Sequence, residues 1–466
     1  MNKPIARSKL QDQIAPRLAR LRAGFNSGRT RAHAWRYEQL FRIEAMLTER
    51  EDEFAAALFK DLGKSPGDAF TTEIGFVKAE ARLARKRLRR WMRPRRVGTP
   101  MLALPARSKI VPEPLGVALI IGPWNYPIQL VLAPLVGAIA AGNCAVVKPS
   151  EIATHSAAAL ARYLPDYLDP DCITVIEGGV SETEALLAVR WDKIFYTGGG
   201  RVGRIVMAAA AKHLTPVTLE LGGKSPAIVL EDANIEAAAR RIVWGRFLNT
   251  GQTCVSPDYV LVAPGREPAL LEAMKAVLTH FFGADPRTSP DFGRIINDHH
   301  FNRLTAMLED GEVVAGGQID KNSRYIAPTI LRKVSPEAPV MQEEIFGPIL
   351  PVLTMASLNE AIAFVDARPK PLALYLFSRS REAARRVIAE TSAGGVTIND
   401  TVLHLAVPGL PFGGVGDSGT GAYHGIHGFR AFSHDKAVLN KPSWPDPPLR
   451  YPPGSRFKRR WLRRIL

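Results

Sequence analysis

The feature that most constrains the fold of this chain is a long segment without charge. No residue in positions 114–147 is acidic or basic. A helix that crosses a membrane needs about 20 consecutive apolar residues, but Gly122, Pro123, Asn125 and Pro127 interrupt the middle of this segment. The pattern therefore favours a buried strand, a tight turn, a buried helix and a second buried strand.

The same alternation of apolar strands and helical segments continues along the chain. Short, wholly apolar strands separated by helices are typical of parallel sheets, which are covered on both faces. The sequence therefore predicts an α/β fold, preceded by largely helical residues and followed by an extended, proline-rich arm. Strands are predicted at 117–121, 145–147, 173–176, 193–196, 227–230 and 259–262, and helices at 128–141, 156–168, 182–189, 202–213 and 267–282.

Length and cysteine content limit the class of protein further. At roughly 150 residues per domain, a chain of 466 residues is expected to form about three domains or fewer. The three cysteines, Cys144, Cys172 and Cys254, are too few for a disulfide framework and indicate a reducing compartment. The N-terminal residues do not assemble the run of roughly 7–15 apolar residues of a secretory signal. We therefore expect a cytoplasmic location.

The formal net charge of +16 suggests an anionic partner and has to be located in the chain. Basic residues concentrate in segments 17–31, 82–96 and 456–466. The first two are predicted to be solvated faces of helices. Neither has the interleaved aromatic residues of a base-stacking surface, and the chain has no zinc-finger or RNA-recognition signature. We therefore expect no nucleic-acid partner.

The third basic segment, the tail at 456–466, has an amphipathic pattern. Phe457, Trp461, Leu462 and Ile465 fall on one side of a helix, and arginine and lysine crowd the rest. This pattern fits a helix that lies on an anionic membrane surface. The alternative is a frayed, solvated tail, because so short a helix is marginal in water.

A glycine fingerprint is the first candidate for a binding site. Gly198, Gly200 and Gly203 lie between a predicted strand and a predicted helix, as in a loop that holds a dinucleotide pyrophosphate at a helix N-terminus. This fingerprint also requires an acidic residue about 20 positions further on. Glu220 stands near that place and is one candidate for the ribose ligand.

Cys254 is the second candidate, because its neighbours are small and polar. A thiol at a turn that enters a helix has a lowered pKa, since backbone N–H groups and the helix dipole stabilise the thiolate. The alternative is a packed, inert cysteine. Cys144 and Cys172 are both expected in or beside buried strands.

Glu220 and Asn125 are the remaining candidates. Glu220 ends an apolar strand, where burial raises the pKa of a carboxyl toward neutrality and suits it to act as a general base; the alternative is a buried ion pair, for example with Lys224. Asn125 stands in a turn next to two prolines, so its amide is rigid enough to donate to an oxyanion. The alternative for Asn125 is an ordinary turn residue.

Taken together, these segments resemble the NAD(P)-dependent aldehyde dehydrogenase superfamily. The resemblance extends from about residue 20 to about residue 440 and is closest to the class 3 branch, which includes aromatic and fatty aldehyde dehydrogenases. The motifs that carry it, in the order of the family, are PWNYP (123–127), KPSE (148–151), TGGGRVG (197–203), LELGGKSP (219–226), GQTC (251–254), EEIFGPI (343–349) and PFGGVGDSG (411–419).

The resemblance implies a mechanism of covalent catalysis. The Cys254 thiolate would attack the aldehyde carbonyl to give a thiohemiacetal, whose oxyanion the Asn125 amide and the Cys254 backbone N–H would hold. Loss of hydride to the nicotinamide would leave a thioester, which water activated by Glu220 would hydrolyse to the carboxylic acid. The resemblance thus favours the base role of Glu220, and it implies no metal ion.

The resemblance also implies residues for cofactor and substrate. Glu151 would favour NAD by repelling the 2′-phosphate of NADP, although Lys148 and Arg201 leave NADP possible. A serine of many relatives is replaced here by Gly199. The implied cofactor residues are Trp124, Lys148, Glu151, Gly198, Val202, Gly203, Leu221, Glu344 and Phe346. A funnel for medium-chain or long-chain aliphatic or aromatic aldehydes would be lined near Tyr126, Trp244, Asn399 and His404.

The domain organisation implied by the resemblance has two Rossmann-like parallel-sheet domains and a small oligomerisation arm. The cofactor-binding domain would comprise 1–97 and 117–221, the catalytic domain 222–425, the arm 98–116 and 426–455, and the basic amphipathic tail 456–466. A homodimer is implied, cytoplasmic or peripheral to a membrane through the tail. A CoA-acylating semialdehyde dehydrogenase and a non-enzymatic basic scaffold with a relic site are the alternatives.

Overall fold

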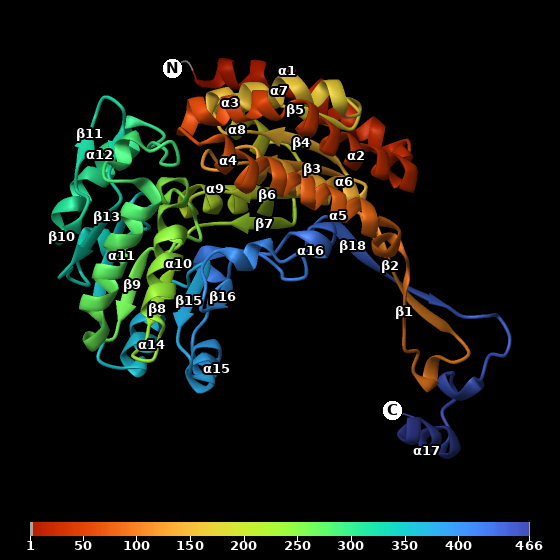
Figure 1. Ribbon diagram of the computed structural model, residues 1–466. Helices are drawn as coiled ribbons and strands as arrows, with labels where there is room; N and C mark the ends of the chain where they lie inside the picture. Colours follow the sequence, from red (N-terminus) through yellow and green to blue (C-terminus); the bar gives the residue numbers. More distant parts are fainter. Residues whose placement is uncertain (1–2, 466) are drawn as a thin grey trace.

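The structure is a computed structural model that describes the backbone of residues 3–465 and the side chains of residues 14–464. Two parallel sheets, each flanked by helices, lie side by side, and a narrow arm extends from the first of them (Figure 1). The α/β fold and its two parallel-sheet units, predicted from the sequence, are confirmed. The assignment of residues to named domains stays a prediction.

The first sheet has six strands in the order β17-β7-β6-β3-β4-β5. All neighbours are parallel except the edge strand β17. The strands are β3 (Val117–Ile121), β4 (Cys144–Lys148), β5 (Ile173–Val175), β6 (Lys193–Thr197), β7 (Val217–Glu220) and β17 (Gly419–Thr420). The helices of this unit are α1 (Lys3–Asn26), α2 (His33–Glu49), α3 (Glu51–Leu62), α4 (Pro66–Ala69), α5 (Gly75–Met92), α6 (Gln129–Ala141), α7 (Thr154–Tyr167), α8 (Val180–Leu187), α9 (Gly200–Ala211) and α16 (Gly425–Ala431).

The second sheet has seven strands in the order β10-β13-β14-β9-β8-β15-β16, with only the edge strand β10 antiparallel. The strands are β8 (Pro226–Val229), β9 (Tyr259–Val262), β10 (Glu312–Ala315), β13 (Thr329–Arg332), β14 (Ile349–Thr354), β15 (Ala373–Phe377) and β16 (Gly395–Ile398), and a separate ribbon consists of β11 (Ile319–Asp320) and β12 (Tyr325–Ile326). The helices are α10 (Ile235–Phe247), α11 (Glu267–Phe282), α12 (Asp298–Ala306), α13 (Pro339–Gln342), α14 (Leu358–Asp366) and α15 (Arg381–Glu390).

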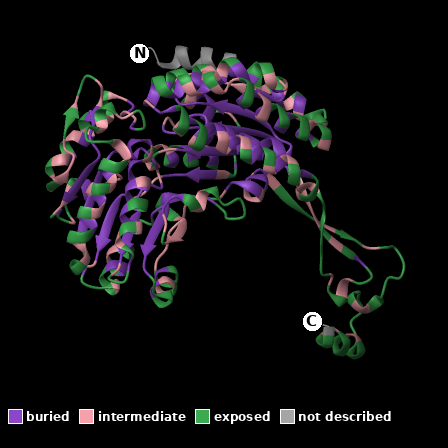
Figure 2. Cartoon of the chain, in the orientation of Figure 1, coloured by how far each residue is buried: buried purple, intermediate pink, exposed green. Residues whose placement is uncertain are grey.

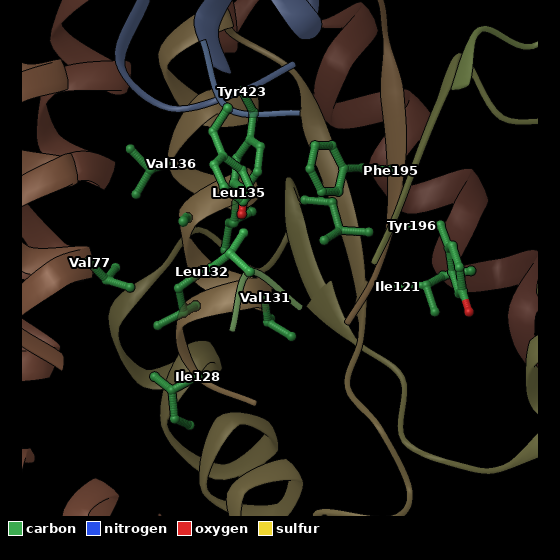
Figure 3. Close-up of a cluster of buried hydrophobic side chains, with 14 of the residues drawn as sticks. Val77, Ile121, Ile128, Val131, Leu132, Leu135, Val136, Phe195, Tyr196 and Tyr423 are labelled. Carbon is green, nitrogen blue, oxygen red and sulfur yellow. The ribbon is translucent and has the colours of Figure 1, made fainter. Parts of the chain in front are cut away.

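The uncharged segment forms the centre of the first unit. β3 and α6 are wholly buried, and α6 packs between the sheet and the helices α2, α5 and α16. One cluster of buried hydrophobic side chains includes Leu132 and Leu135 of α6, Phe195 of β6 and Tyr423 (Figure 3). Because every side of α6 meets protein, no position along it accommodates a charge, which explains the composition of the segment.

The basic segments are partly paired with acidic residues on a neighbouring helix and in the loop between α7 and β5. Arg82 and Arg85 of α5 both bind Glu44 of α2, and Arg29 binds Asp169 and Asp171. Solvent-facing arginine and lysine account for most of the rest of the segment at 82–96.

The arm is a three-stranded antiparallel sheet of β1 (Arg95–Val97), β2 (Arg107–Pro114) and β18 (Ser433–Asn440). Most of its residues are exposed, in contrast to the buried centres of the two large sheets (Figure 2). The tail helix α17 (Arg456–Ile465) follows at its far end (Figure 1). Within residues 3–465, the structure contains no helix with the length and hydropathy needed to cross a membrane.

The topology of the first sheet predicts where a ligand binds. The chain continues from β3 to β4 on one side and later returns to β6 on the other, so the strand order reverses beside β3. In open α/β sheets, ligands bind at the carboxyl ends of the strands at such a switch point. The residues that follow β3, β4, β6 and β7 at this edge are Gly122, Pro149, Gly198 and Leu221.

Candidate active site

Two loops meet at this edge, one from each sheet. The Asn125 turn follows β3, and the loop at 248–258 precedes β9 of the second sheet. The Asn125 side-chain amide donates to the carbonyl oxygen of Gln252 over 3.0 Å. The Asn249 amide in turn donates to the carbonyl oxygens of Asn125 (2.8 Å) and Gln252 (3.1 Å). The first two of these hydrogen bonds hold the two loops together, and the third, from Asn249 to Gln252, lies within the second loop.

The loop before β9 needs unusual backbone conformations. Asn249 and Thr250 have φ values of 52° and 57°, in the left-handed region that asparagine tolerates better than most residues. Gly251 has φ 73°, and a Cβ there would lie 2.1 Å from the carbonyl oxygen of Gly347. Only glycine therefore fits at position 251, and the chain turns sharply enough to place Cys254 beside the Asn125 turn.

Cys254 lies half-buried in the turn between the short helix η4 (Leu248–Gly251) and β9. Burial raises the pKa of its thiol, and the carboxyls of Glu344 and Glu220 raise it further. The sequence-based expectation of a lowered pKa is therefore wrong. The backbone N–H groups of Cys254 and Val255 do stabilise the thiolate, but burial and the two carboxyls outweigh them, and no helix starts at Cys254 to add a dipole.

Cys254 is exposed to a cavity, whereas the other two cysteines are completely buried in or beside strands, as expected from the sequence. Within the described part of the chain, no backbone carbonyl accepts a hydrogen bond from the N–H of Cys254, and this N–H stabilises the sulfur of its own side chain. An N–H beside the sulfur that no carbonyl occupies is what a developing oxyanion on a bound carbonyl requires.

Glu220 ends β7 and is buried. Neither carboxyl oxygen has a hydrogen-bond partner among the described residues, and burial raises the pKa well above its ordinary value. The expected raised pKa is confirmed. The alternative of an ion pair with Lys224 is wrong, because Lys224 binds Asp258 over 2.6 Å on the side of the second sheet.

Asn125, Glu220 and Cys254 line one cavity of about 450 Å³. Among the residues that the resemblance implies for the cofactor, the cavity includes Trp124, Gly198, Leu221, Glu344 and Phe346. The others, Lys148, Glu151, Val202 and Gly203, lie outside its lining. The Lys148 ammonium is 3.2 Å from the Glu151 carboxyl, and that carboxyl is 45% exposed, so it is accessible to a ligand that extends beyond the cavity.

Glu344 lines the same cavity as Gly198 and Gly199 of the glycine loop that follows β6. Burial and the charge of Asp258 raise its pKa to about 8, and its Oε1 has no partner among the described residues. A Cβ on Gly222 would lie 1.9 Å from the other carboxyl oxygen of Glu344, so a larger residue there would displace this carboxyl. The unpaired Oε1 of Glu344 is therefore suited to accept a hydrogen bond from a hydroxyl group of a bound ligand.

The glycine loop and two aromatic rings shape the rest of the cavity. Gly198 has φ 157°, and α9 starts two residues later, so backbone N–H groups at a helix N-terminus face the cavity. The rings of Trp124 and Phe346 meet edge to face with centroids 5.3 Å apart. The N-terminus of α9, the rings of Trp124 and Phe346 and the unpaired oxygen of Glu344 together form a site that fits a nicotinamide dinucleotide.

Three cavity residues could not be predicted from the sequence. His299, His300 and Arg303 of α12 line the cavity, and the His300 ring lies 4.9 Å from Trp124. Burial lowers the pKa of His300 to about 4, so this ring is neutral. The two adjacent histidines are the only local signal, and no motif of the family includes them.

The residues predicted for the substrate funnel have different surroundings. Tyr126 is buried, and its hydroxyl is 2.6 Å from that of Thr253, the neighbour of Cys254. Trp244 is half-buried on α10. The Asn399 amide exchanges hydrogen bonds with the Ser378 backbone at the end of β16 and is occupied there.

His404 belongs to an aromatic cluster that the sequence did not predict. Its ring packs against Phe412 with centroids 6.0 Å apart, and burial lowers its pKa to about 4. The cluster continues through Tyr423 and His424 to Phe76. Burial raises the pKa of Tyr423, and the charges of Glu220 and Cys254 raise it further.

Comparisons with known proteins agree with this geometry. The sequence profile of the Aldehyde dehydrogenase family matches residues 8–438. The chain is 49% identical to the human "Aldehyde dehydrogenase family 3 member B1" over 453 residues, 97% of each chain. It is also 49% identical to the rat "Aldehyde dehydrogenase, dimeric NADP-preferring" over 428 residues, 92% of this chain and 94% of the rat protein.

A solved structure supports the same assignment. The substrate-bound state of AldH from Staphylococcus aureus superposes with a TM-score of 0.95 at 46% identity and covers 97% of this chain and 99% of that one. The chain therefore belongs to the aldehyde dehydrogenase family, the oxidoreductases that convert aldehydes to carboxylic acids with NAD(P).

Proposed function

We propose that Cys254, Asn125 and Glu220 carry out this oxidation in the cavity that they share. The Cys254 thiol loses its proton to solvent, and the sulfur bonds to the aldehyde carbon. Nitrogen hydrogens of the Asn125 amide and the Cys254 backbone stabilise the oxyanion. A bound NAD(P) would supply the hydride acceptor, and loss of hydride from that carbon would leave a thioester on Cys254.

Glu220 is assigned as the base. Its unpaired, buried carboxyl has a raised pKa, which suits it to take a proton near neutral pH. It removes a proton from water as the water attacks the thioester, which releases the acid and the Cys254 thiolate. A general base beside the sulfur supports hydrolysis over transfer to CoA. The ribose-ligand alternative for Glu220 is weaker, because Glu344 has an unpaired oxygen on the cofactor side.

We assign NAD as the preferred cofactor and NADP as a second one. Glu344 would bond the nicotinamide ribose and Phe346 would line the nicotinamide pocket, with Trp124, Gly198 and Leu221 beside them. Lys148 and Glu151 would bind the adenosine ribose, where the Glu151 carboxyl disfavours a 2′-phosphate. Val202 and Gly203 on α9 would support the adenine. The rat relative named as NADP-preferring supports retaining NADP.

Medium-chain or long-chain aliphatic and aromatic aldehydes are the proposed substrates. The aromatic cluster around Phe412 and His424, together with Tyr126, His404 and the half-buried Trp244, is the proposed lining for the substrate. The contact of Tyr126 with Thr253, the neighbour of Cys254, supports this place. Asn399 is not part of this proposal, since its amide is occupied.

A cytoplasmic homodimer is proposed for the assembly, and its arm provides the contact surface. Apolar side chains on the arm and its end are exposed, including Met101 (65%) and Trp444 (82%). The rat relative is named dimeric. Three free cysteines support a reducing compartment.

The tail helix is proposed to contact anionic membranes. Phe457 and Trp461 are 67% and 42% exposed, and their rings are 6.4 Å apart on one side of α17. Basic residues occupy the rest of the helix. The Ile465 side chain, also predicted for the apolar side, lies outside the described residues, as does Leu466.

Replacing the nucleophile tests the assignment of Cys254. Cys254→Ala is expected to reduce aldehyde-dependent NAD reduction by at least about a thousandfold, because no other group forms the covalent intermediate. NADH absorbance with a panel of aliphatic and aromatic aldehydes is the measurement. Cys172→Ala, a buried cysteine away from the cavity, serves as the control and should retain its rate. Equal rates for Cys254→Ala and the natural chain contradict the assignment.

Replacing the base separates the two half-reactions. Glu220→Gln is expected to give a burst of NADH close to one per active site, followed by steady turnover about a hundredfold below that of the natural chain. The base must be deprotonated, so the rate of the natural chain falls as pH drops through the raised pKa of Glu220. Rapid-mixing absorbance and a pH profile measure both effects. A Glu220→Gln variant with normal steady turnover and the same acid limb rules out the base role.

Membrane contact is tested by co-sedimentation with liposomes. The full chain should sediment with vesicles that contain phosphatidylserine and much less with pure phosphatidylcholine, and binding should weaken in high salt. A variant ending at residue 455 should lose this binding. Phe457→Ala/Trp461→Ala keeps the charge and separates apolar insertion from electrostatic attraction. Equal sedimentation with and without the tail refutes the proposal.

A further inference from the structure

A buried ion pair stands behind the Asn125 turn. Lys64 follows the glycine that ends α3, and Glu73 lies in a π-helical turn before α5. Their side chains are 2% and 0% exposed, and the Lys64 ammonium donates to Glu73 Oε1. Burying two opposite charges removes their hydration, and the mutual attraction compensates for this only when further hydrogen bonds satisfy both groups.

Those further hydrogen bonds all go to the Asn125 turn and the start of α6. The Lys64 ammonium donates to the Asn125 carbonyl oxygen over 3.1 Å and lies 4.0 Å from the centroid of the Tyr126 ring. Glu73 Oε2 accepts from the backbone N–H groups of Ile128 (2.9 Å) and Gln129 (3.1 Å). The pair therefore holds the chain on both sides of Pro127.

The position of the Asn125 amide follows from these contacts. One of its two hydrogens is fixed on the Gln252 carbonyl. Since the amide group is planar, the direction of the second hydrogen depends on the backbone of Asn125, which Lys64 and Asn249 hold from opposite elements. Displacement of a catalytic group by about 1 Å is enough to lower a rate by about a hundredfold.

We propose that Lys64 and Glu73 are positioning residues that hold the Asn125 amide at the place where the oxyanion forms. Neither side chain lines the cavity, so neither touches substrate or cofactor. This inference rests on the proposed role of Asn125. It differs from a purely structural ion pair, which would affect folding without a separate effect on the chemical step.

A pair of neutral double variants separates these two roles. Lys64→Met/Glu73→Gln removes both charges but retains an acceptor for the N-terminus of α6. Lys64→Gln/Glu73→Gln is also neutral and in addition retains a donor near the Asn125 carbonyl. The matched control is Lys78→Met, which removes the cation from an ion pair between α5 and α3 that does not contact the turn.

The measurements are the melting temperature, the rate of the NADH burst and the KM for NAD. We expect Lys64→Met/Glu73→Gln to melt within a few degrees of the natural chain, to keep its KM for NAD within threefold and to lose about tenfold to a hundredfold in burst rate. Lys64→Gln/Glu73→Gln should recover at least threefold of this loss while remaining slower than the natural chain. Lys78→Met should keep the full burst rate.

Each outcome decides a separate claim. If a neutral double variant folds and has the same burst rate as the natural chain, the positioning role is overturned. If only Lys64→Gln/Glu73→Gln folds, its burst rate is compared with that of the natural chain, and an equal rate overturns the positioning role. Asn125→Ala serves as the reference and should be at least as slow as either double variant. If Asn125→Ala keeps the natural burst rate, the proposed role of Asn125 fails; if it is slow while the double variants are fast, only the positioning role fails.

Discussion

The hydrogen bonds between the Asn125 turn and the loop of Gln252 hold together the two loops that carry the reactive residues, one from each sheet. The loop of Asn125 belongs to the first sheet and the loop of Cys254 to the second, and the amides of Asn125 and Asn249 join the two loops with hydrogen bonds of 3.0 and 2.8 Å. Neither sheet alone places a donor beside the sulfur. The left-handed backbone at 249–251 and the buried ion pair of Lys64 and Glu73 both hold these two loops in position.

The cavity beside these two loops contains acidic groups without partners. Glu220 is buried with both carboxyl oxygens unpaired, Glu344 is half-buried with its Oε1 unpaired, and the pKa of each is raised. Desolvated carboxyls cost folding free energy, and they persist in a structure when their reactivity or ligand binding requires them. The raised pKa of the Cys254 thiol has the same origin, so activation of the sulfur depends on a base and on what a bound ligand changes in the cavity.

The sequence predicted the parts of the molecule in which one local pattern determines the outcome. β3, α6 and β4 follow from an uncharged segment interrupted by glycine and proline, and the helix predicted at 267–282 has the same limits as α11. Glu220 at a strand end and Cys254 among small polar residues were recognisable for the same reason. The helix expected at Cys254 is absent because the chain continues through Ser256 and Pro257 into β9.

Residues whose role depends on long-range contacts could not be predicted. Lys64 and Glu73 look like ordinary surface residues in the sequence, and only the packing of α5 and the π-helical turn at 70–74 against α6, with α3 against that turn, buries them. His300 reaches the cavity through the placement of α12. Asn399 was predicted to lie near the substrate, but its side-chain amide exchanges hydrogen bonds with the Ser378 backbone.

The covalent intermediate is the central claim, and peptide mass spectrometry tests it most directly. Glu220→Gln is mixed with NAD and an aldehyde, quenched after the burst and digested. The account predicts the mass of the acyl group on the peptide that contains Cys254, only when NAD is present, with Cys144 and Cys172 unmodified. NADH formed in an amount equal to the enzyme, with the acyl group on another residue or on none, would contradict it.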